Sequence, residues 1–139
     1  FSHDPQYLEQ LIQASEDADV VIGSRYVQGG GIEGWEGWRK HLSSWGNIYS
    51  RLILRTPVRD LTAGFNLINM DMLRTIPLHK LSSSGYAFQI ELKHMLYKHG
   101  ATFTEVPIMF KTRREGESKI SGHIVREGIL APWKLLLRK

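Results

Sequence analysis

The 139-residue chain contains no cysteine and no long apolar run. Without thiols it forms neither a disulfide framework nor a thiolate metal site, and this fits a reducing compartment. No window reaches the roughly 18 uninterrupted apolar residues that a membrane-spanning helix needs. The six histidines lack the spacing of metal ligands, and His94 and His99 are predicted to lie on an ordinary helix surface.

The composition is that of a globular protein. Hydrophobic residues make up 42% and charged residues 23%, with no internal repeat, and the length is enough for one ordinary domain. The formal net charge of +4 favours an anionic partner, such as a phosphate-bearing substrate, an acidic lipid or a nucleic acid. A nucleic acid is the weakest of the three, because the aromatic residues are not interleaved with basic ones in a stacking pattern.

The order of the predicted elements indicates an α/β fold. The patterns predict helices over 5–17, 39–55, 71–76, 86–99 and 123–139, and strands over 18–22, 66–70 and 103–110. The first strand is apolar throughout, as in a mostly parallel sheet. Gly29 to Gly37 shows no periodicity and is predicted to be a loop. Pro107 should bend the last strand or place it at an edge, and Pro132 should kink the last helix.

Two arginines and a serine make the stretch from Gly23 to Ser43 a candidate phosphate site. Arg25 follows the buried strand, at the end where open α/β sheets place their ligands. Arg39 and Ser43 are four residues apart near the start of a helix and share one face. Together they suit a phosphate monoester on a lipid chain. Two plainer interpretations stay open: Arg25 in a surface ion pair, and Arg39 at the solvated start of an amphipathic helix.

The aromatic residues of this region allow two interpretations. Trp35 and Trp38 suit a core or, beside a basic pair, a membrane interface. The helix that follows has an apolar stripe, which is more typical of a core than of a lipid-facing surface. The stripe includes Trp45, Tyr49, Leu52 and Ile53.

Seven short blocks follow one another along the chain between Phe1 and about Ser121. They are Gly23-Ser24-Arg25-Tyr26, Gly29-Gly30-Gly31, Trp38-Arg39-Lys40, Asp60-Leu61-Thr62-Ala63-Gly64-Phe65, Gly85-Tyr86-Ala87-Phe88-Gln89-Ile90-Glu91, Glu105-Val106-Pro107-Ile108 and Gly116-Glu117-Ser118-Lys119. Each block is weak alone. In this order they resemble the consecutive motifs of polyprenol (dolichol) phosphate mannosyltransferases, which are family 2 inverting glycosyltransferases.

The resemblance implies a fold and an activity. The fold is part of a nucleotide-sugar transferase of the GT-A type, with a mixed, mostly parallel sheet flanked by helices. The activity is transfer of mannose from GDP-mannose to a polyprenyl (dolichyl-type) monophosphate with inversion, aided by Mg²⁺ or Mn²⁺, by a cytoplasmic protein bound peripherally at the membrane face. Two alternatives stay open: another sugar donor such as UDP-glucose, and a noncatalytic basic module that binds membranes.

The resemblance also implies that residues 1–139 are the acceptor-side part of one catalytic domain. The first five residues have no signal-peptide features, and in the family the matching stretch directly follows an Asp-x-Asp metal motif. We therefore expect a fragment whose nucleotide-binding half and metal-binding aspartates precede Phe1. Ser2 then lies at most on the rim of the metal site, and no metal ligand is assigned. Alone, such a chain should be inactive and poorly stable.

The resemblance assigns Arg25, Arg39 and Ser43 to the acceptor phosphate and places Asp60 near the sugar. For Asp60, the plainer alternative is an ordinary turn residue. A phosphate monoester has a second pKa of about 6 and arrives largely deprotonated, so no strong general base is needed. Catalysis then rests on positioning and on charge stabilisation.

Two further segments belong to the site by resemblance. Gln89 and Glu91 lie on the active-site helix but face different sides of it, so at most one lines the site; a solvated helix face is the alternative. A cationic loop is implied to close over the donor diphosphate, and a disordered surface loop is its alternative. The loop residues are Arg113, Arg114, Ser118 and Lys119.

Overall fold

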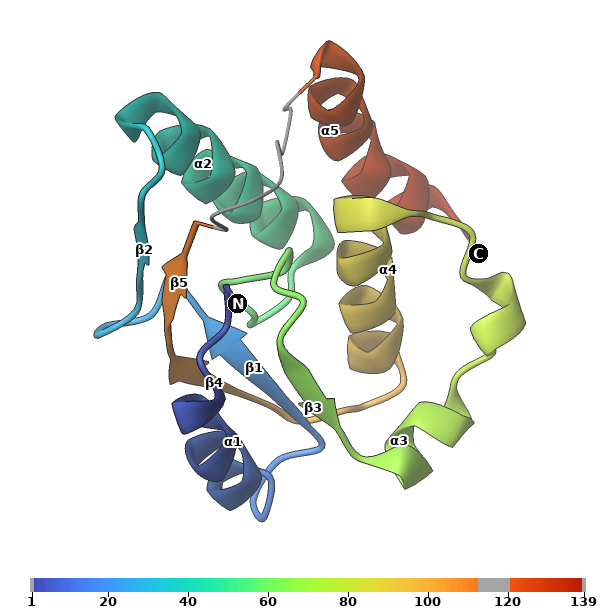
Figure 1. The fold of residues 1–139 in the computed structure, drawn as a ribbon. Helices are drawn as coiled ribbons and strands as arrows, with labels where there is room; N and C mark the ends of the chain where they lie inside the picture. Colours follow the sequence, from blue (N-terminus) through green and yellow to red (C-terminus); the bar gives the residue numbers. More distant parts are fainter. Residues whose placement is uncertain (1, 113–120, 139) are drawn as a thin grey trace.

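The computed structural model describes residues 2–112 and 121–138, in which helices and strands alternate (Figure 1). The helices are α1 (Leu8–Ala14), α2 (Gly37–Leu54), α3 (Met70–Thr75), α4 (Gly85–Lys98) and α5 (Gly122–Leu137), with 3-10 turns at Pro5–Tyr7 and Leu78–Lys80. The strands are β1 (Val20–Ser24), β2 (Gly31–Glu33), β3 (Asn66–Ile68), β4 (Phe103–Pro107) and β5 (Met109–Lys111). The predicted α/β class is confirmed.

Strand β1 lies at the centre of a three-stranded sheet with the order β3-β1-β4. It runs antiparallel to β3 and parallel to β4. A second sheet pairs β2 with β5 in parallel. Within the described residues the strand pairings are therefore mixed, as predicted, but they are divided between two small sheets.

The predicted strand over 103–110 is divided at Pro107. β4 ends at this residue, because proline has no N–H with which to continue a ladder. The Ile108 N–H donates to the Ser24 carbonyl at 3.0 Å, and the Ile108 carbonyl accepts from the Gly31 N–H at 3.0 Å. The chain thus passes from one sheet to the other beside the end of β1, and the predicted bend is confirmed.

The stretch from Gly29 to Gly37 is not wholly a loop, so that prediction was wrong. Gly31–Glu33 forms β2, whose partner β5 is far away in the sequence and leaves no local periodicity. Before it, the backbone of Gly30 passes so close to β1 that a Cβ would lie 2.5 Å from the Ser24 carbonyl oxygen. Glycine at this position lets the chain return to the end of β1.

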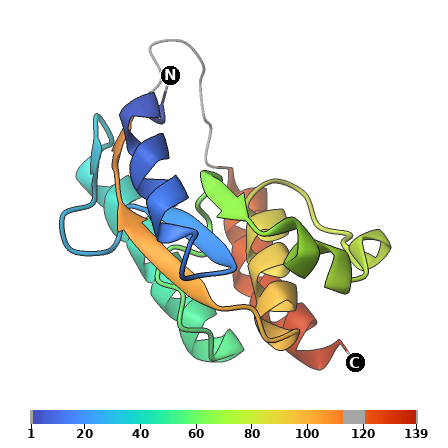
Figure 2. The same ribbon diagram turned by 90° about the horizontal axis from the view of Figure 1, so that it is seen from below.

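Helices lie on both faces of the central sheet (Figure 2), and alternate residues of β1 point to opposite faces. Val20 and Ile22 are buried in one cluster with Leu54 of α2 and Leu96 of α4. Val21 is buried on the other face in a cluster with Leu11 of α1. Since both faces of β1 are covered, the strand is fully buried and its carboxyl end is held rigidly.

Helices α2 and α5 pack side by side (Figure 1). The Tyr49 hydroxyl donates to the Ile129 carbonyl at 2.9 Å and accepts from the Trp133 Nε1–H at 2.8 Å. However, Trp45 is 68% exposed and Leu52 is 71% exposed. The predicted core position is therefore wrong for these two stripe residues. None of the described helices is long and apolar enough to cross a membrane.

Helix α4 buries polar side chains among its apolar ones, which was not predicted. His94 is only 8% exposed, so its prediction as a surface residue was wrong. Burial, and then the charge of Lys98, lowers the pKa of His94. Glu91 and Lys93 are also buried. Helix α4 therefore contributes polar and charged groups, as well as packing, to the interior.

Candidate functional site

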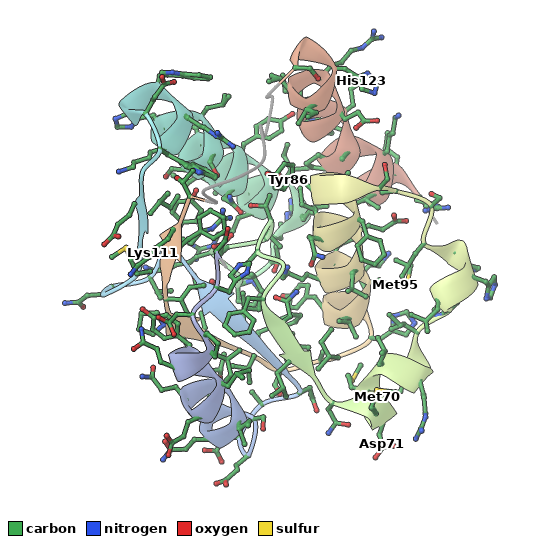
Figure 3. The ribbon with its side chains drawn as sticks, viewed as in Figure 1. Met70, Asp71, Tyr86, Met95, Lys111 and His123 are labelled. Carbon is green, nitrogen blue, oxygen red and sulfur yellow. The ribbon has the colours of Figure 1, made fainter. Side chains whose placement is uncertain are left out.

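A cavity of about 260 Å³ lies beside the carboxyl end of β1. The end of β1, a turn after Asp60, the start of α4 and strand β5 line it, and Tyr86 of α4 is labelled in Figure 3. The lining residues are His3, Gly23, Arg25, Trp35, Thr62, Ala63, Gly64, Gly85, Tyr86, Gln89, Ile108 and Phe110. Two of the predicted site residues, Arg25 and Gln89, therefore line this cavity.

Arg25 forms a buried ion pair with Asp60. Its Nε donates to one carboxylate oxygen at 2.8 Å and its Nη2 to the other at 2.7 Å, and the backbone N–H of Arg25 also donates to Asp60. Nη2 donates to Thr62 Oγ1 at 2.8 Å as well. Burial opposes the charge of Arg25, but the hydrogen bonds and charge of Asp60 outweigh it, so the pKa of Arg25 is raised. Arg25 is thus paired, but in the interior and not on the surface.

Side chains from two other elements hold the turn that carries Asp60. The Glu105 carboxylate, on β4, accepts from the N–H groups of Arg59 and Asp60, each at 2.9 Å. The Asn47 Oδ1, on α2, accepts from the Leu61 N–H at 2.8 Å and the Thr62 N–H at 3.3 Å. Asp60 is therefore held in place by side chains of two other elements and pairs with a buried arginine. An ordinary turn residue would have neither kind of contact.

Lys93 reaches the same turn from α4. Its Nζ donates to the Leu61 carbonyl at 3.1 Å, to the Ala63 carbonyl at 2.6 Å and to the Gln89 Oε1 at 3.3 Å. Burial is the main cause that lowers the pKa of Lys93 to about 7. Lys93 was not predicted as a site residue, although the polar pair Gln89 and Lys93, four residues apart within an apolar helix, was a usable signal.

Arg39 and Trp35 extend the site on the side of α2. The Arg39 guanidinium carbon lies 4.3 Å from the Trp35 ring centroid, within cation–π range, and that of Arg25 lies 5.9 Å from the same centroid. The buried Nε of Arg39 has no hydrogen-bond partner within the part of the chain that the structure describes. Two guanidinium groups therefore lie around one indole ring at the cavity.

Ser43 is joined to the end of β1 through Tyr26. The Tyr26 hydroxyl lies 2.5 Å from the Ser43 Oγ, to which it donates a hydrogen bond. Burial is the largest effect on Tyr26 and raises the pKa of its phenol. The ring also lies 5.2 Å from the Arg25 guanidinium carbon. Tyr26 thus connects Ser43 of α2 to Arg25. The prediction that Arg25 and Ser43 act on one phosphate requires them to lie near each other.

Gln89 and Glu91 are separated by the turn of α4, as predicted. Gln89 lines the cavity, and its Oε1 accepts from Asn66 Nδ2 at 3.0 Å as well as from Lys93. Glu91 does not join the site: its carboxylate accepts from the Ser83 N–H at 2.9 Å and from Arg138 at 2.7 Å. Burial opposes the charge of Glu91, but these hydrogen bonds and Arg138 outweigh it and lower its pKa.

No group of three or more His, Cys, Asp or Glu side chains suited to a metal ion occurs among residues 2–112 and 121–138. Ser2 is buried, and its Oγ has no partner among those residues. Both oxygens of the Asp60 carboxylate accept from the Arg25 side chain, and one of them also accepts from the Arg25 backbone N–H. The described residues therefore do not fit a divalent cation. The predicted donor-loop residues, Arg113, Arg114, Ser118 and Lys119, lie outside the described residues.

These contacts define an α/β protein in which a fixed arginine and a second arginine flank a cavity at a strand end, a geometry suited to a phosphate-bearing ligand. No family model matches the chain. It is 41% identical over 139 residues to an undecaprenyl-phosphate mannosyltransferase of Micrococcus luteus, covering 99% of this chain and 57% of the relative. It is also 41% identical over 135 residues to a polyprenol monophosphomannose synthase of Mycolicibacterium smegmatis, covering 95% of this chain and 51% of the relative.

The predicted resemblance is therefore confirmed: the chain is homologous, over nearly its whole length, to parts of polyprenyl-phosphate mannosyltransferases. The chain spans about half the length of these curated relatives. The similarity covers the residues of the site described above.

Proposed function

We propose that this chain is the acceptor-side part of an enzyme that transfers mannose from GDP-mannose to a polyprenyl monophosphate. The observation that supports this most directly is the arrangement of Arg25 and Arg39 around Trp35 at the cavity. The names of the two relatives give the sugar and the lipid phosphate, and the resemblance adds the guanosine nucleotide and a GT-A type domain.

In this proposal the two arginines and Ser43 hold the acceptor phosphate. Asp60 occupies Nε and Nη2 of Arg25, which leaves Nη1 for a ligand. The Arg39 guanidinium lies over the Trp35 ring, 4.3 Å from its centroid, with a buried Nε that has no partner in the described ranges. Planar guanidinium groups match phosphate oxygens better than a point charge does.

The reaction then needs positioning more than proton transfer. A phosphate oxygen of the lipid forms a bond to the anomeric carbon of mannose while the bond from that carbon to GDP breaks, so the configuration is inverted. The attacking phosphate is already largely deprotonated near neutral pH, since its second pKa is about 6. The cations hold it in line for this displacement.

The proposal includes a divalent cation and a donor-binding loop, both implied by the resemblance. The cation would stabilise charge on the departing diphosphate. We assign no step to it, because the described residues offer no set of ligands that fits it. The loop of Arg113, Arg114, Ser118 and Lys119 suits the donor diphosphate by its charge.

The proposal also includes a membrane surface as a partner, with the protein bound peripherally at its cytoplasmic face. Exposed apolar side chains lie along α2 and α5, and the last turns of these helices carry the cationic residues Arg51 and Lys134, which suit acidic lipids. We call this surface the α2–α5 apolar face; its exposed members are Trp38, Leu42, Trp45, Ile48 and Leu52 of α2, and Ile129, Leu130, Trp133, Leu136 and Leu137 of α5.

The proposal is tested on the complete natural protein, because the relatives are about twice as long as this chain. Release of GDP from GDP-mannose is measured with and without a polyprenyl phosphate, and UDP-glucose is offered as a competing donor. We expect GDP release to depend on the acceptor lipid and to continue when UDP-glucose is added as a competitor. Lipid binding with no GDP release would overturn the enzyme and leave a noncatalytic membrane module.

A further inference from the structure

The Lys93 side chain is buried and has no carboxylate partner among the described residues. It is 1% exposed, and no ion pair to it occurs within the described residues. Burying a charge is costly unless its hydrogen bonds are satisfied, and an apolar side chain would fill a core position at lower cost. An ammonium group at this position therefore needs a reason beyond packing.

The contacts of Lys93 supply such a reason. An ammonium has three N–H donors, and Lys93 has three acceptors: the carbonyls of Leu61 and Ala63, and the Gln89 Oε1. The two carbonyls flank Thr62, whose Oγ1 accepts from Arg25 at 2.8 Å. Lys93 therefore holds the turn that supports the position of Arg25.

The third contact sets the orientation of an amide. Gln89 Oε1 accepts from both Lys93 and Asn66, so the oxygen is turned toward the interior. The Gln89 NH₂ group is left as a donor on a residue that lines the cavity, with no partner within the described part of the chain. One ammonium thus fixes two walls of the cavity.

We propose that Lys93 is a positioning residue, whose ammonium holds the Thr62 turn and directs the Gln89 amide toward an oxygen of the bound substrate. The inference rests on the proposed function. It adds a residue of α4 to the acceptor site, and Lys93 itself touches no substrate.

The charge state of Lys93 should then appear in the pH dependence of the reaction. The charged groups that act on it are Asp60 and Glu105, which favour its protonated form, and Arg25, which opposes it. Burial is the largest effect, so the pKa of Lys93 falls to about 7. A neutral amine has only two N–H donors and cannot serve all three acceptors.

The first test compares Lys93→Met and Lys93→Arg in the complete natural protein. Lys98→Met is the control, since Lys98 is exposed on the same helix. We expect kcat/KM to fall about 30-fold or more in Lys93→Met and to change less than twofold in the control. In the wild type, kcat/KM should decline with an apparent pKa near 7, and in Lys93→Arg this decline should move above pH 9. The inference would be overturned if Lys93→Met had the same kcat/KM as the wild type. It would also be overturned if kcat/KM of Lys93→Arg declined at the same pH as that of the wild type.

A second measurement does not depend on turnover. The side-chain amide signals of Gln89 are followed by NMR through a pH titration of the wild type, with thermal unfolding of each variant recorded as a check on folding. We expect the Gln89 signals to titrate near pH 7 and to stop doing so in Lys93→Arg. Signals that do not titrate contradict the inference even when mannose is transferred. If they titrate but no mannose is transferred, the proposed function fails and the positioning role stands.

Discussion

Proteins usually bury hydrophobic side chains and expose charged ones, but the turn that carries Asp60 and the α2–α5 apolar face do the opposite. Around the turn, charged side chains are buried and nearly every donor has an acceptor. On the α2–α5 apolar face, large hydrophobic side chains are exposed, with Leu52 at 71%. Buried polar networks make a site rigid, whereas an exposed apolar face suits association with a partner. The described part of the molecule thus combines a preformed polar site with an adjacent exposed apolar surface.

The largest effect should come from breaking the ion pair at the centre of the turn. Asp60→Asn leaves the buried guanidinium of Arg25 without its counter-charge, so we expect the free energy of unfolding to fall by about 3–5 kcal/mol. Asp71→Asn is the control, because Asp71 pairs with Arg74 on the surface, where its side chain is 89% exposed. Chemical denaturation measures both. Equal stability of the two variants would contradict a structural role for the Asp60 network.

Next in size is the pH dependence that Lys93 gives to stability. Between pH 7 and 10.5 the unfolded chain holds a proton on Lys93 that the folded chain lacks, since folding lowers its pKa from 10.5 to about 7. The free energy of unfolding should therefore rise with pH in this window. The rise should be absent from the Lys93→Met variant, and the difference between the two unfolding curves isolates this residue. If the difference in free energy of unfolding stayed constant between pH 7 and 10.5, the pKa of Lys93 would not be lowered by folding.

A third prediction concerns the geometry of Arg25. In Arg25→Lys the charge is retained, but the two-pronged hydrogen bonding to Asp60 is lost. Hydrogen bonds to charged groups contribute about 1.5–3 kcal/mol, so kcat/KM of the complete protein should fall roughly 10- to 100-fold. Arg74→Lys, on the surface of α3, should leave it unchanged. Full activity of Arg25→Lys would show that charge alone suffices.

The smallest effect is expected from the apolar face. Leu52→Ser should reduce binding to vesicles of phosphatidylcholine and phosphatidylglycerol by roughly tenfold, since burying a leucine contributes about 1.5–3 kcal/mol. It should leave the unfolding transition nearly unchanged, because the side chain is exposed. Leu8→Ser, on the exposed side of α1, provides the comparison and should not alter vesicle binding. Equal losses in both variants would remove the reason to assign the membrane to this face.

The sequence predicted the long helices well because their apolar periodicity is local. The bounds of α2 and α4 follow from such patterns and from Gly100, whose φ of 86° ends α4. Periodicity does not tell whether a partner covers a stripe, so it favoured a core position for Trp45 and Leu52, whose side chains are exposed. Strand β2 was missed for another reason: three residues whose partner strand is distant carry no pattern.

The site was predictable only in part. The resemblance identified Arg25, Arg39, Ser43, Asp60, Gln89 and Glu91 as a group. The structure brings the elements of all but Glu91 together near the cavity. The resemblance could not show that Asp60 binds Arg25, because the two are 35 positions apart and the contact depends on tertiary packing. Lys93 was missed because lysine is rarely buried. Their roles in binding a phosphate stay predictions.

The most direct test of the account is the assignment of Arg39 to the acceptor's phosphate. In the complete protein, KM for the polyprenyl phosphate and KM for GDP-mannose are measured for the wild type and for Arg39→Lys. We predict that KM for the lipid phosphate rises about tenfold or more, since the flat guanidinium on Trp35 is lost, while KM for GDP-mannose stays within twofold. A rise in KM for GDP-mannose with no change for the lipid would contradict the account and assign Arg39 to the donor.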